Sequence, residues 1–231
     1  MKVSVCMATH NGEKYLRQQI DSILPQLGTN DEFIISDDNS SDTTRSILSS
    51  YDDPRMKILE STGFGTPAKN FEHALAHSSH HFIFLADQDD VWHKEKINVM
   101  KTTLKLHDLV VCDCRIVNEE LHPIYDSFFV HNRSKSGLLK NFVKNSFIGC
   151  CMAFRRTVLE KSLPFPEDIS LHDQWIGLVA ERYFNVTFIP QILVDHRRHP
   201  ENYSSTGERS ENSLEKKIKL RFYLAKKLLA H

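Results

Sequence analysis

Long hydrophobic runs are absent from this sequence of 231 residues. Clean apolar runs such as residues 82–86 are far shorter than the about 20 residues that a transmembrane helix needs. Lys2 is followed by a brief apolar stretch that soon reaches the polar pair Thr9 and His10, which is not the pattern of a signal peptide. We therefore exclude an integral membrane protein and expect a cytoplasmic one.

An excess of charge of one sign is also lacking. The 29 Lys and Arg residues nearly balance the 30 Asp and Glu residues, which leaves a formal net charge of -1. This balance gives no general electrostatic basis for nucleic-acid binding, and we expect no nucleic-acid partner. Hydrophobic residues make up 40% of the chain and charged residues 26%, which is typical of a soluble globular protein and not of a disordered one.

Cysteines are few and odd in number, which excludes a secreted disulfide scaffold. The five are Cys6, Cys112, Cys114, Cys150 and Cys151, and most of them lie inside apolar runs. We expect reduced, buried side chains in a reducing compartment. Their spacings lack the two-to-four-residue interval that is usual between paired zinc ligands, so a zinc site is not expected.

Short apolar runs alternate with helix-like stretches through the first half of the sequence. The predicted strands cover residues 3–8, 33–35, 56–59, 82–86 and 109–112, and the predicted helices cover residues 13–24, 42–51, 67–77 and 94–106. Ser40 or Ser41 is expected to cap the second helix. The alternation predicts an α/β fold with a mostly parallel sheet that is covered by helices on both faces.

The second half is less regular. We expect a strand at residues 147–154, a helix at 172–183, a strand at 186–189 and a loop at 126–136. We interpret residues 1–211 as a single domain, in which residues 1–115 bind a nucleotide and residues 116–211 complete the pocket. Residues 212–231 are expected to form a basic C-terminal helix.

Polar side chains follow most of the predicted strands of the first half. The chain reaches residues 9–12 after the first strand, 37–40 after the second, 87–90 after the fourth and Asp113 after the fifth. Asp, Asn, Ser and Gly are common in turns and helix caps, which would explain any one of these groups. Because ligands of open parallel sheets bind at the carboxyl ends of the strands, several such groups on one edge indicate a binding site.

The sequence Asp87-Gln88-Asp89-Asp90 is the sharpest local signal. In an extended backbone the carboxylates of Asp87 and Asp89 would point to the same side. Two hard oxygen ligands suit Mg²⁺ or Mn²⁺, which commonly bind carboxylates together with substrate phosphates. An acidic turn that caps the following helix is about as good an explanation of these residues by themselves.

Two further groups stand out in the second half. Asp173 opens the predicted helix beside His172 and Trp175, where a carboxylate could be a general base or could simply favour the helix N-terminus. Residues 195–199 combine two histidines and two arginines, which suits a diphosphate or a metal ion, although by themselves they are better explained as a solvated loop.

The last segment, residues 214–231, carries six Lys and Arg residues and one Glu. Its apolar residues Leu214, Ile218, Phe222 and Leu229 fall near helical spacing. A basic amphipathic helix can lie on an anionic membrane surface, or it can pack on its own domain with its lysines in water. The sequence leaves both alternatives open, so peripheral contact with the inner face of the membrane is one of two expectations.

Taken together, these motifs resemble glycosyltransferase family 2, whose members have the GT-A fold, a Rossmann-like α/β architecture. The resemblance rests on residues 3–24, on Ile35-Ser36-Asp37-Asp38-Asn39-Ser40-Ser41-Asp42, and on Asp87-Gln88-Asp89-Asp90-Val91-Trp92, which is similar to the family's D-x-D motif. Residues 69–72, 149–154, 163–166 and 172–175 are similar to the bacterial rhamnosyltransferase-like branch. Arg198, Pro200 and His10 depart from the residues usual in that branch.

The resemblance implies roles for thirteen residues. Asp173 would be the catalytic base, Asp89 and His199 would hold a divalent cation, and the residues implied to bind the nucleotide sugar are Thr9, Asn11, Glu13, Asp38, Lys69, Asp87, Gln88 and Arg197. His172 and Trp175 would bind the acceptor. Asp38 would contact the base, Asp87 the ribose, and Lys69 the diphosphate.

The implied function is a metal-dependent, inverting glycosyl transfer with Mg²⁺ or Mn²⁺ as cofactor. The branch points to dTDP-L-rhamnose as donor, with UDP-hexoses as alternatives, and to a bacterial surface glycan or a polyprenyl-linked oligosaccharide as acceptor. Two other functions stay open at this point. Asp87-Gln88-Asp89-Asp90-Val91 also fits the motif of haloacid-dehalogenase-type phosphohydrolases, and a non-catalytic nucleotide-sugar-binding protein could keep the same fold.

Overall fold

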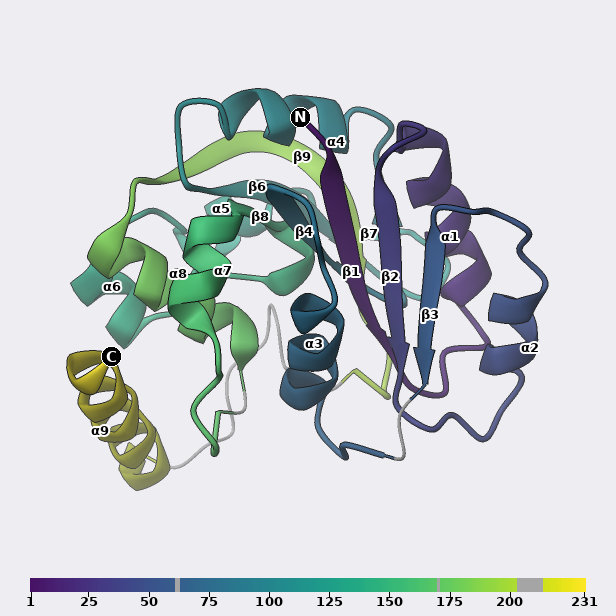
Figure 1. The fold of residues 1–231 in the computed structure, drawn as a ribbon. Coiled ribbons are helices and arrows are strands. Elements are labelled where there is room, and N and C mark those ends of the chain that lie inside the picture. The colour runs from purple at the N-terminus through teal and green to yellow at the C-terminus, as the bar shows by residue number, and fades with distance from the viewer. Residues whose placement is uncertain (61–62, 170, 203–213) are drawn as a thin grey trace.

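A computed structural model describes residues 1–60, 63–169, 171–202 and 214–231. Helices lie on both sides of a central sheet (Figure 1). The strands of this sheet are β1 (Val3–Thr9), β2 (Glu32–Asp37), β3 (Met56–Glu60), β4 (Phe82–Asp87), β5 (Val91–Trp92), β6 (Leu109–Val117), β7 (Pro123–Tyr125), β8 (Met152–Arg155) and β9 (Val186–Arg197).

Strands β1 to β4 form one parallel part of the sheet, and β6 and β9 form another parallel pair. The strand order is β3-β2-β1-β4-β8-β6-β9-β5, and β7 pairs with β6. β1, β2, β3 and β4 run parallel, whereas β8 runs antiparallel to both β4 and β6. The register pairs Thr9 with Asp37 and Ala8 with Asp87, so the polar groups that follow β1, β2 and β4 meet at one edge, as predicted.

Among the described residues, the side chains of Thr66 and Ser127 cap helices. Thr66 caps α3, where its side chain accepts a hydrogen bond from the Lys69 amide and Pro67 occupies the first turn. The helices are α1 (Leu16–Ile23), α2 (Thr44–Ser49), α3 (Pro67–Ala76), α4 (Lys96–Thr103), α5 (Phe128–Asn132), α6 (Leu138–Val143), α7 (Arg156–Ser162), α8 (His172–Tyr183) and α9 (Leu214–Ala230), with 3₁₀ turns at Leu24–Gln26 and Gly149–Cys151.

The core follows the apolar strands. Residues 82–86 of β4 are fully buried, as expected for a strand covered on both faces. All five cysteines are buried and reduced, which agrees with the sequence prediction. α9 packs on the domain through Leu224 and Leu228, so one of its faces is docked.

Several local predictions were wrong. β6 continues through Asp113 to Val117, so Asp113 does not end a strand, and β9 extends from the predicted residues 186–189 to Arg197. Residues 147–154 contain a 3₁₀ turn before the short strand β8, and the predicted loop at 126–136 contains α5. The N-cap of α2 is Thr43 and not Ser40 or Ser41. The predicted boundary at residue 211 lies outside the described residues.

The described part of the chain contains no helix that is both long and apolar enough to span a membrane.

Candidate active site

A cavity of about 850 Å³ opens where β1, β2 and β4 end. The first turn of α8 and the segment after β9 complete its wall. Ten of the thirteen residues singled out from the sequence line it, and they are Thr9, Asn11, Glu13, Asp38, Asp87, Gln88, Asp89, His172, Asp173 and His199. The structure therefore brings these residues together from separate stretches of the chain, while their individual roles remain predictions.

The loops after β1 and β2 are fastened to each other. Asn11, which has a left-handed backbone with φ 48°, accepts a hydrogen bond from the Ser41 amide at 2.9 Å. The Glu13 carboxylate accepts hydrogen bonds from the Thr43 amide and hydroxyl. The side chains of Asn11 and Glu13 thus fix the shape of the cavity rim through contacts within the protein. Any contact of theirs with a nucleotide sugar would be made from these positions.

Gln88 joins the end of β1 to the acidic turn. Its Oε1 accepts hydrogen bonds from the Thr9 hydroxyl at 2.6 Å and from the His10 amide at 2.9 Å, and its Nε2 donates to the His10 carbonyl. A Cβ added at Gly12 would lie 2.4 Å from the same Oε1, so this clamp requires glycine there. The Asp38 carboxylate, which also lines the cavity, accepts hydrogen bonds from the backbone amides of Phe64 and Gly65.

Asp87 ends β4, and the chain turns at Gln88 and Asp89 instead of staying extended through residues 87–90 as we expected. Asp87 and Asp89 still both line the cavity, whereas Asp90 is fully buried beneath them. Burial and the neighbouring carboxylates of Asp90 and Asp89 raise the pKa of Asp87 well above its usual value. A cationic group or a metal ion that enters this turn would therefore relieve electrostatic repulsion.

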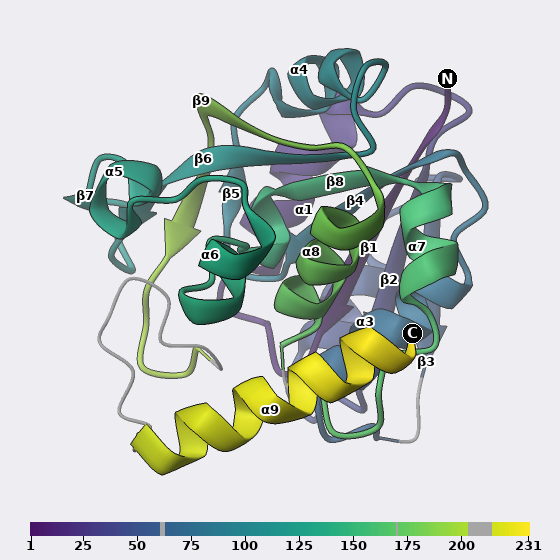
Figure 2. The same cartoon turned by 90° about the vertical axis from the view of Figure 1, so that its left-hand side faces the viewer.

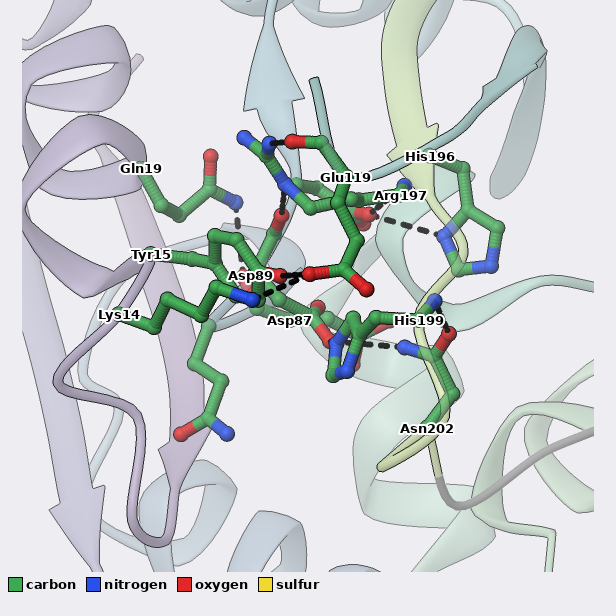
Figure 3. A network of polar contacts seen from close by, with 12 residues as sticks. Lys14, Tyr15, Gln19, Asp87, Asp89, Glu119, His196, Arg197, His199 and Asn202 are labelled. Atoms are coloured by element: carbon green, nitrogen blue, oxygen red, sulfur yellow. Dashed lines mark hydrogen bonds and ion pairs between the residues drawn. The ribbon is translucent and has the colours of Figure 1, made fainter. Parts of the chain in front are cut away.

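Asp89, His199 and Asn202 converge at the mouth of the acidic turn (Figure 3). The Asp89 Oδ2 lies 2.8 Å from the His199 Nε2 and accepts a hydrogen bond from the Asn202 Nδ2 at 2.9 Å. The His199 amide donates to the Asn202 Oδ1 at 2.7 Å, which fixes the segment after β9 against the turn. The Asp89 carboxylate is a hard oxygen ligand that fits Mg²⁺ or Mn²⁺, and the His199 imidazole nitrogen suits Mn²⁺ better than Mg²⁺, which prefers oxygen.

A second, more deeply buried group of residues could also bind a metal. Ligand atoms of Asp87, Asp90, Cys150 and His196 lie within 4.8 Å of one another. The His196 Nδ1 is 2.9 Å from the Asp90 Oδ1. Burial by itself would lower the pKa of His196, but the Asp90 carboxylate raises it well above its usual value. This ion pair already balances the charge of Asp90, so Asp89 and His199 are the better candidates for a hard cation.

Arg197 does not line the cavity, contrary to the donor-binding role expected for it. Its Nε donates to the Asp89 carbonyl at 2.8 Å and its Nη2 to the Gln18 Oε1 at 2.6 Å, while Nη1 donates to the Glu119 carbonyl. The guanidinium also stacks over the Tyr15 ring at 4.4 Å (Figure 3). Arg197 is buried, so it holds the acidic turn in place from behind.

Arg197→Lys should therefore weaken both the fold and the cation site. A single ammonium cannot donate in three directions, so we expect the free energy of unfolding to fall by about 2–4 kcal/mol. The cation concentration for half-maximal activity should rise severalfold, because the Asp89 backbone loses its support. Thermal melts and cation titrations measure both effects. The exposed Arg17 provides the control, and equal behaviour of Arg17→Lys and Arg197→Lys would contradict this role.

Asp173 also lines the cavity, from the first turn of α8. Burial raises the pKa of its carboxyl to about 6, although hydrogen bonds from the amides of Gln174 and Gly149 act in the other direction. The preceding His172 is stacked on Phe71 at 4.1 Å, and burial lowers its pKa to about 3. His172 is therefore neutral near pH 7, and its buried Nε2 has no hydrogen-bond partner among the described residues.

Two other predicted site residues lie away from the cavity. Trp175 is fully buried and donates its indole N–H to the Ser162 carbonyl at 2.9 Å, so it has no surface to offer an acceptor. Lys69 is exposed on α3, while its neighbours Asn70 and Phe71 line the cavity instead. Asn70 donates to the Thr9 carbonyl at 3.1 Å. The sequence did contain a signal for this, because Asn70 and Phe71 follow Lys69 directly and offer an amide and an aromatic ring.

Sequence reasoning also missed the pair formed by Tyr15 and Glu119. The Tyr15 hydroxyl donates to Glu119 at 2.8 Å, and Lys14 forms an ion pair with the same carboxylate (Figure 3). Glu119 follows β6, outside every motif that the sequence displays. Only the path of β6 past Asp113 brings it to the cavity rim, so no local pattern could have revealed it.

The family model for Glycosyl transferase family 2 matches residues 4–163. The chain belongs to this family. The predicted family is thereby confirmed, and the haloacid-dehalogenase alternative is removed.

Curated relatives extend the match. The chain is 29% identical over 209 residues to the UDP-Glc:alpha-D-GlcNAc-diphosphoundecaprenol beta-1,3-glucosyltransferase WfgD of Escherichia coli, which covers 88% of this chain and 79% of the relative. It is 26% identical over 213 residues to the dTDP-rhamnosyl transferase RfbG of Shigella flexneri, with 85% and 72% coverage. Because the named donors of these two relatives differ, the rhamnosyltransferase-like branch remains a proposal.

Solved structures confirm the predicted GT-A fold. Residues 1–349 of S. aureus TarS in complex with UDP-GlcNAc superpose with a TM-score of 0.75 at 21% identity, covering 97% of this chain and 66% of that one. The mannosyltransferase PcManGT from Pyrobaculum calidifontis in complex with GDP-Man and Mn²⁺ gives 0.67 at 19% identity, with 87% and 58% coverage. The chain thus spans about two thirds or less of these solved chains.

Proposed function

We propose that the chain transfers a sugar from a nucleoside diphosphate donor to a hydroxyl group of a bacterial glycan or a lipid-linked oligosaccharide. The observation that carries this proposal is that Asp89, His199 and Asp173 all line a single cavity. Cation ligands and a general base are the two parts that an inverting transfer needs at one site. The diphosphoundecaprenol acceptor named for the E. coli relative supports a lipid-linked acceptor here.

The donor would lie across the ends of β1, β2 and β4. Asp38 and Thr9 are placed to meet the nucleoside, and Asp87 is placed to meet its ribose, at the edge where parallel sheets bind nucleotides. A dTDP-sugar such as dTDP-L-rhamnose and a UDP-hexose are both consistent with this arrangement. The relatives support both, since one is named for UDP-Glc and another for dTDP-rhamnose.

We propose that Asp89 and His199 hold Mg²⁺ or Mn²⁺ beside the donor diphosphate. Their contact at 2.8 Å and their position on the cavity wall support this role. When bound, the cation supplies Lewis-acid stabilisation of the negative charge that develops on the leaving diphosphate. Arg197 would keep the Asp89 backbone in place, and Asn202 would orient the Asp89 carboxylate for binding.

Asp173 would accept the proton of the attacking acceptor hydroxyl. As the proton moves to the carboxylate, the hydroxyl oxygen forms a bond to the anomeric carbon, and the bond from that carbon to the diphosphate oxygen breaks with its electron pair. Attack from the side opposite the leaving group inverts the configuration. A pKa of about 6 leaves Asp173 ionised at neutral pH and makes it more basic than an ordinary aspartate.

The pH dependence of transfer follows from this pKa. Because Asp173 must be ionised to accept a proton, we expect kcat/KM to fall about tenfold per pH unit below about pH 6 and to level off above it. Initial rates from pH 4.5 to 8 measure the profile, and donor binding across the same range provides the control. A rate that is independent of pH between 5 and 7 would contradict the assignment of Asp173 as the base.

A thermal-shift panel of nucleotide sugars with Mn²⁺ tests the proposal as a whole. A donor at 100 times its Kd stabilises the native state by about 2.7 kcal/mol, which raises the Tm of a chain of this length by roughly 5–10 °C. The panel comprises dTDP-L-rhamnose, UDP-Glc, UDP-GlcNAc and GDP-Man, each with and without EDTA. We expect one donor to stand out, and no shift with any of them would overturn the proposed donor class. A bound donor without transfer to any acceptor would favour a non-catalytic binder.

A further inference from the structure

Four large apolar side chains are unusually exposed on α6 and α9. Leu139 and Val143 of α6 are 82% and 62% exposed, and Phe222 and Leu229 of α9 are 78% and 74% exposed. Each pair has helical spacing, so each helix presents its two side chains on one face. On α9 this face is the reverse of the one docked through Leu224 and Leu228.

Basic residues surround these side chains. Residues 127–147 contain four Lys and Arg residues and no Asp or Glu, and α9 contains six and a single Glu, although the whole chain has a net charge of -1. The Lys140 ammonium donates to the Ser146 hydroxyl and the Lys144 ammonium to the Asn132 carbonyl, and within the described residues no ion pair joins Lys140, Lys144 or Lys226 to a carboxylate. Burial and the charges of Lys144 and Lys135 lower the pKa of Lys140, which reflects this crowding.

The two helices belong to one side of the molecule. The Arg221 Nη2 donates to the Val143 carbonyl at 2.5 Å, which joins the middle of α9 to the end of α6. Both helices lie on the left in Figure 1 and face the viewer in Figure 2. The nearby Glu181 is already engaged by the Gly137 amide and the Asn141 side chain. The four exposed apolar residues, together with Lys140, Lys144 and Lys226, thus form one basic, partly apolar face.

We propose that this face of α6 and α9 docks on the surface of an anionic phospholipid bilayer. Apolar side chains that are flanked by lysines match the layered chemistry of a bilayer surface, where acyl chains lie beneath anionic headgroups. A second copy of the chain fits less well, because a symmetric contact would bring like charges together. α9 packs against α8, which carries Asp173, so docking turns that side of the cavity toward the bilayer. This orientation toward lipid-linked acceptors rests on the proposed function, whereas the docking itself does not.

Vesicle flotation with the full chain tests this proposal. We expect binding to vesicles of phosphatidylglycerol and phosphatidylcholine at low salt, and little binding to phosphatidylcholine alone. Leu139→Ser/Val143→Ser and Phe222→Ser/Leu229→Ser should each weaken binding about tenfold, and Lys140→Gln/Lys144→Gln should weaken it by a similar factor. Leu106 and Lys105 are also exposed, on the segment after α4, so Leu106→Ser/Lys105→Gln is the matched control and should bind as the wild type does.

Three flotation results would overturn the proposal. They are no binding to the anionic vesicles, equal binding to both kinds of vesicle, and binding that the α6 and α9 variants do not change. Concentration-dependent dimerisation that the same variants abolish would also overturn it in favour of self-association. Donor-induced thermal shifts of each variant separate the two proposals. Lost flotation with an intact shift confirms a docking face apart from the site, while failure of the donor panel leaves the flotation result unaffected.

Discussion

Asp173→Asn should lower the rate of glycosyl transfer by about 10³-fold and leave donor affinity nearly unchanged. Asparagine keeps the size and the hydrogen bond with the Gln174 amide but cannot accept the acceptor's proton. Initial rates with saturating donor measure the loss, and donor-induced thermal shifts measure affinity. Equal loss of both would remove the reason for assigning Asp173 as the base.

The same variant should be more stable than the wild type at neutral pH. Because the folded-state pKa of Asp173 is about 6, above the unfolded value, the native state loses stability as pH rises from about 4 to 6. At pH 7 the ionised carboxylate costs at most about 3 kcal/mol, and asparagine removes this cost. Thermal melts should show that the Tm of the variant exceeds the Tm of the wild type by more at pH 7 than at pH 4. Asp168→Asn, at an exposed position outside the cavity, should change neither rate nor Tm.

Removal of the cation ligand should have an effect of similar size. We expect Asp89→Ala, or EDTA added to the wild type, to lower transfer by about 10³-fold or more, because charge on the leaving diphosphate is no longer offset. Mn²⁺ should also no longer raise the Tm of Asp89→Ala. Calorimetric titration with Mn²⁺ provides a measurement that does not depend on activity. Full activity after exhaustive chelation would refute the metal assignment.

His199→Gln provides a second test of the cation site if Asp89→Ala does not fold. Loss of the imidazole should weaken Mn²⁺ binding at least about tenfold while leaving the Asn202 contact with Asp89 in place. Asp52→Asn, at an exposed aspartate far along the chain from the acidic turn, is the matched control and should bind Mn²⁺ as the wild type does.

Elements with strong local signals could be predicted well from the sequence. The helix expected at residues 172–183 is α8 with the same bounds, because its apolar spacing is regular and Asp173 favours its first turn. The sequence also predicted that the polar groups after β1, β2 and β4 lie close together, since neighbouring parallel strands end at the same edge of the sheet.

β9 shows why other parts could not be predicted. His196 and Arg197 are polar residues that we interpreted as loop, and yet both are buried in a strand. They are stable there because Asp90 and the Asp89 carbonyl supply the matching partners, more than a hundred positions away. The position of Trp175 differs for the converse reason, since His172 and Asp173 line the cavity while the Trp175 side chain is buried in the core.

The path of β9 also limits how the molecule can be divided. β5 follows the acidic turn and pairs antiparallel with β9 through Val91 and Asp195, so the final strand of the second half is hydrogen-bonded close to Asp89, the proposed cation ligand of the first half. A chimera that exchanged residues 1–115 for those of a relative would therefore combine a foreign acidic turn with the original His199 and Arg197. Donor preference should transfer between relatives only when the exchanged block includes residues 186–202.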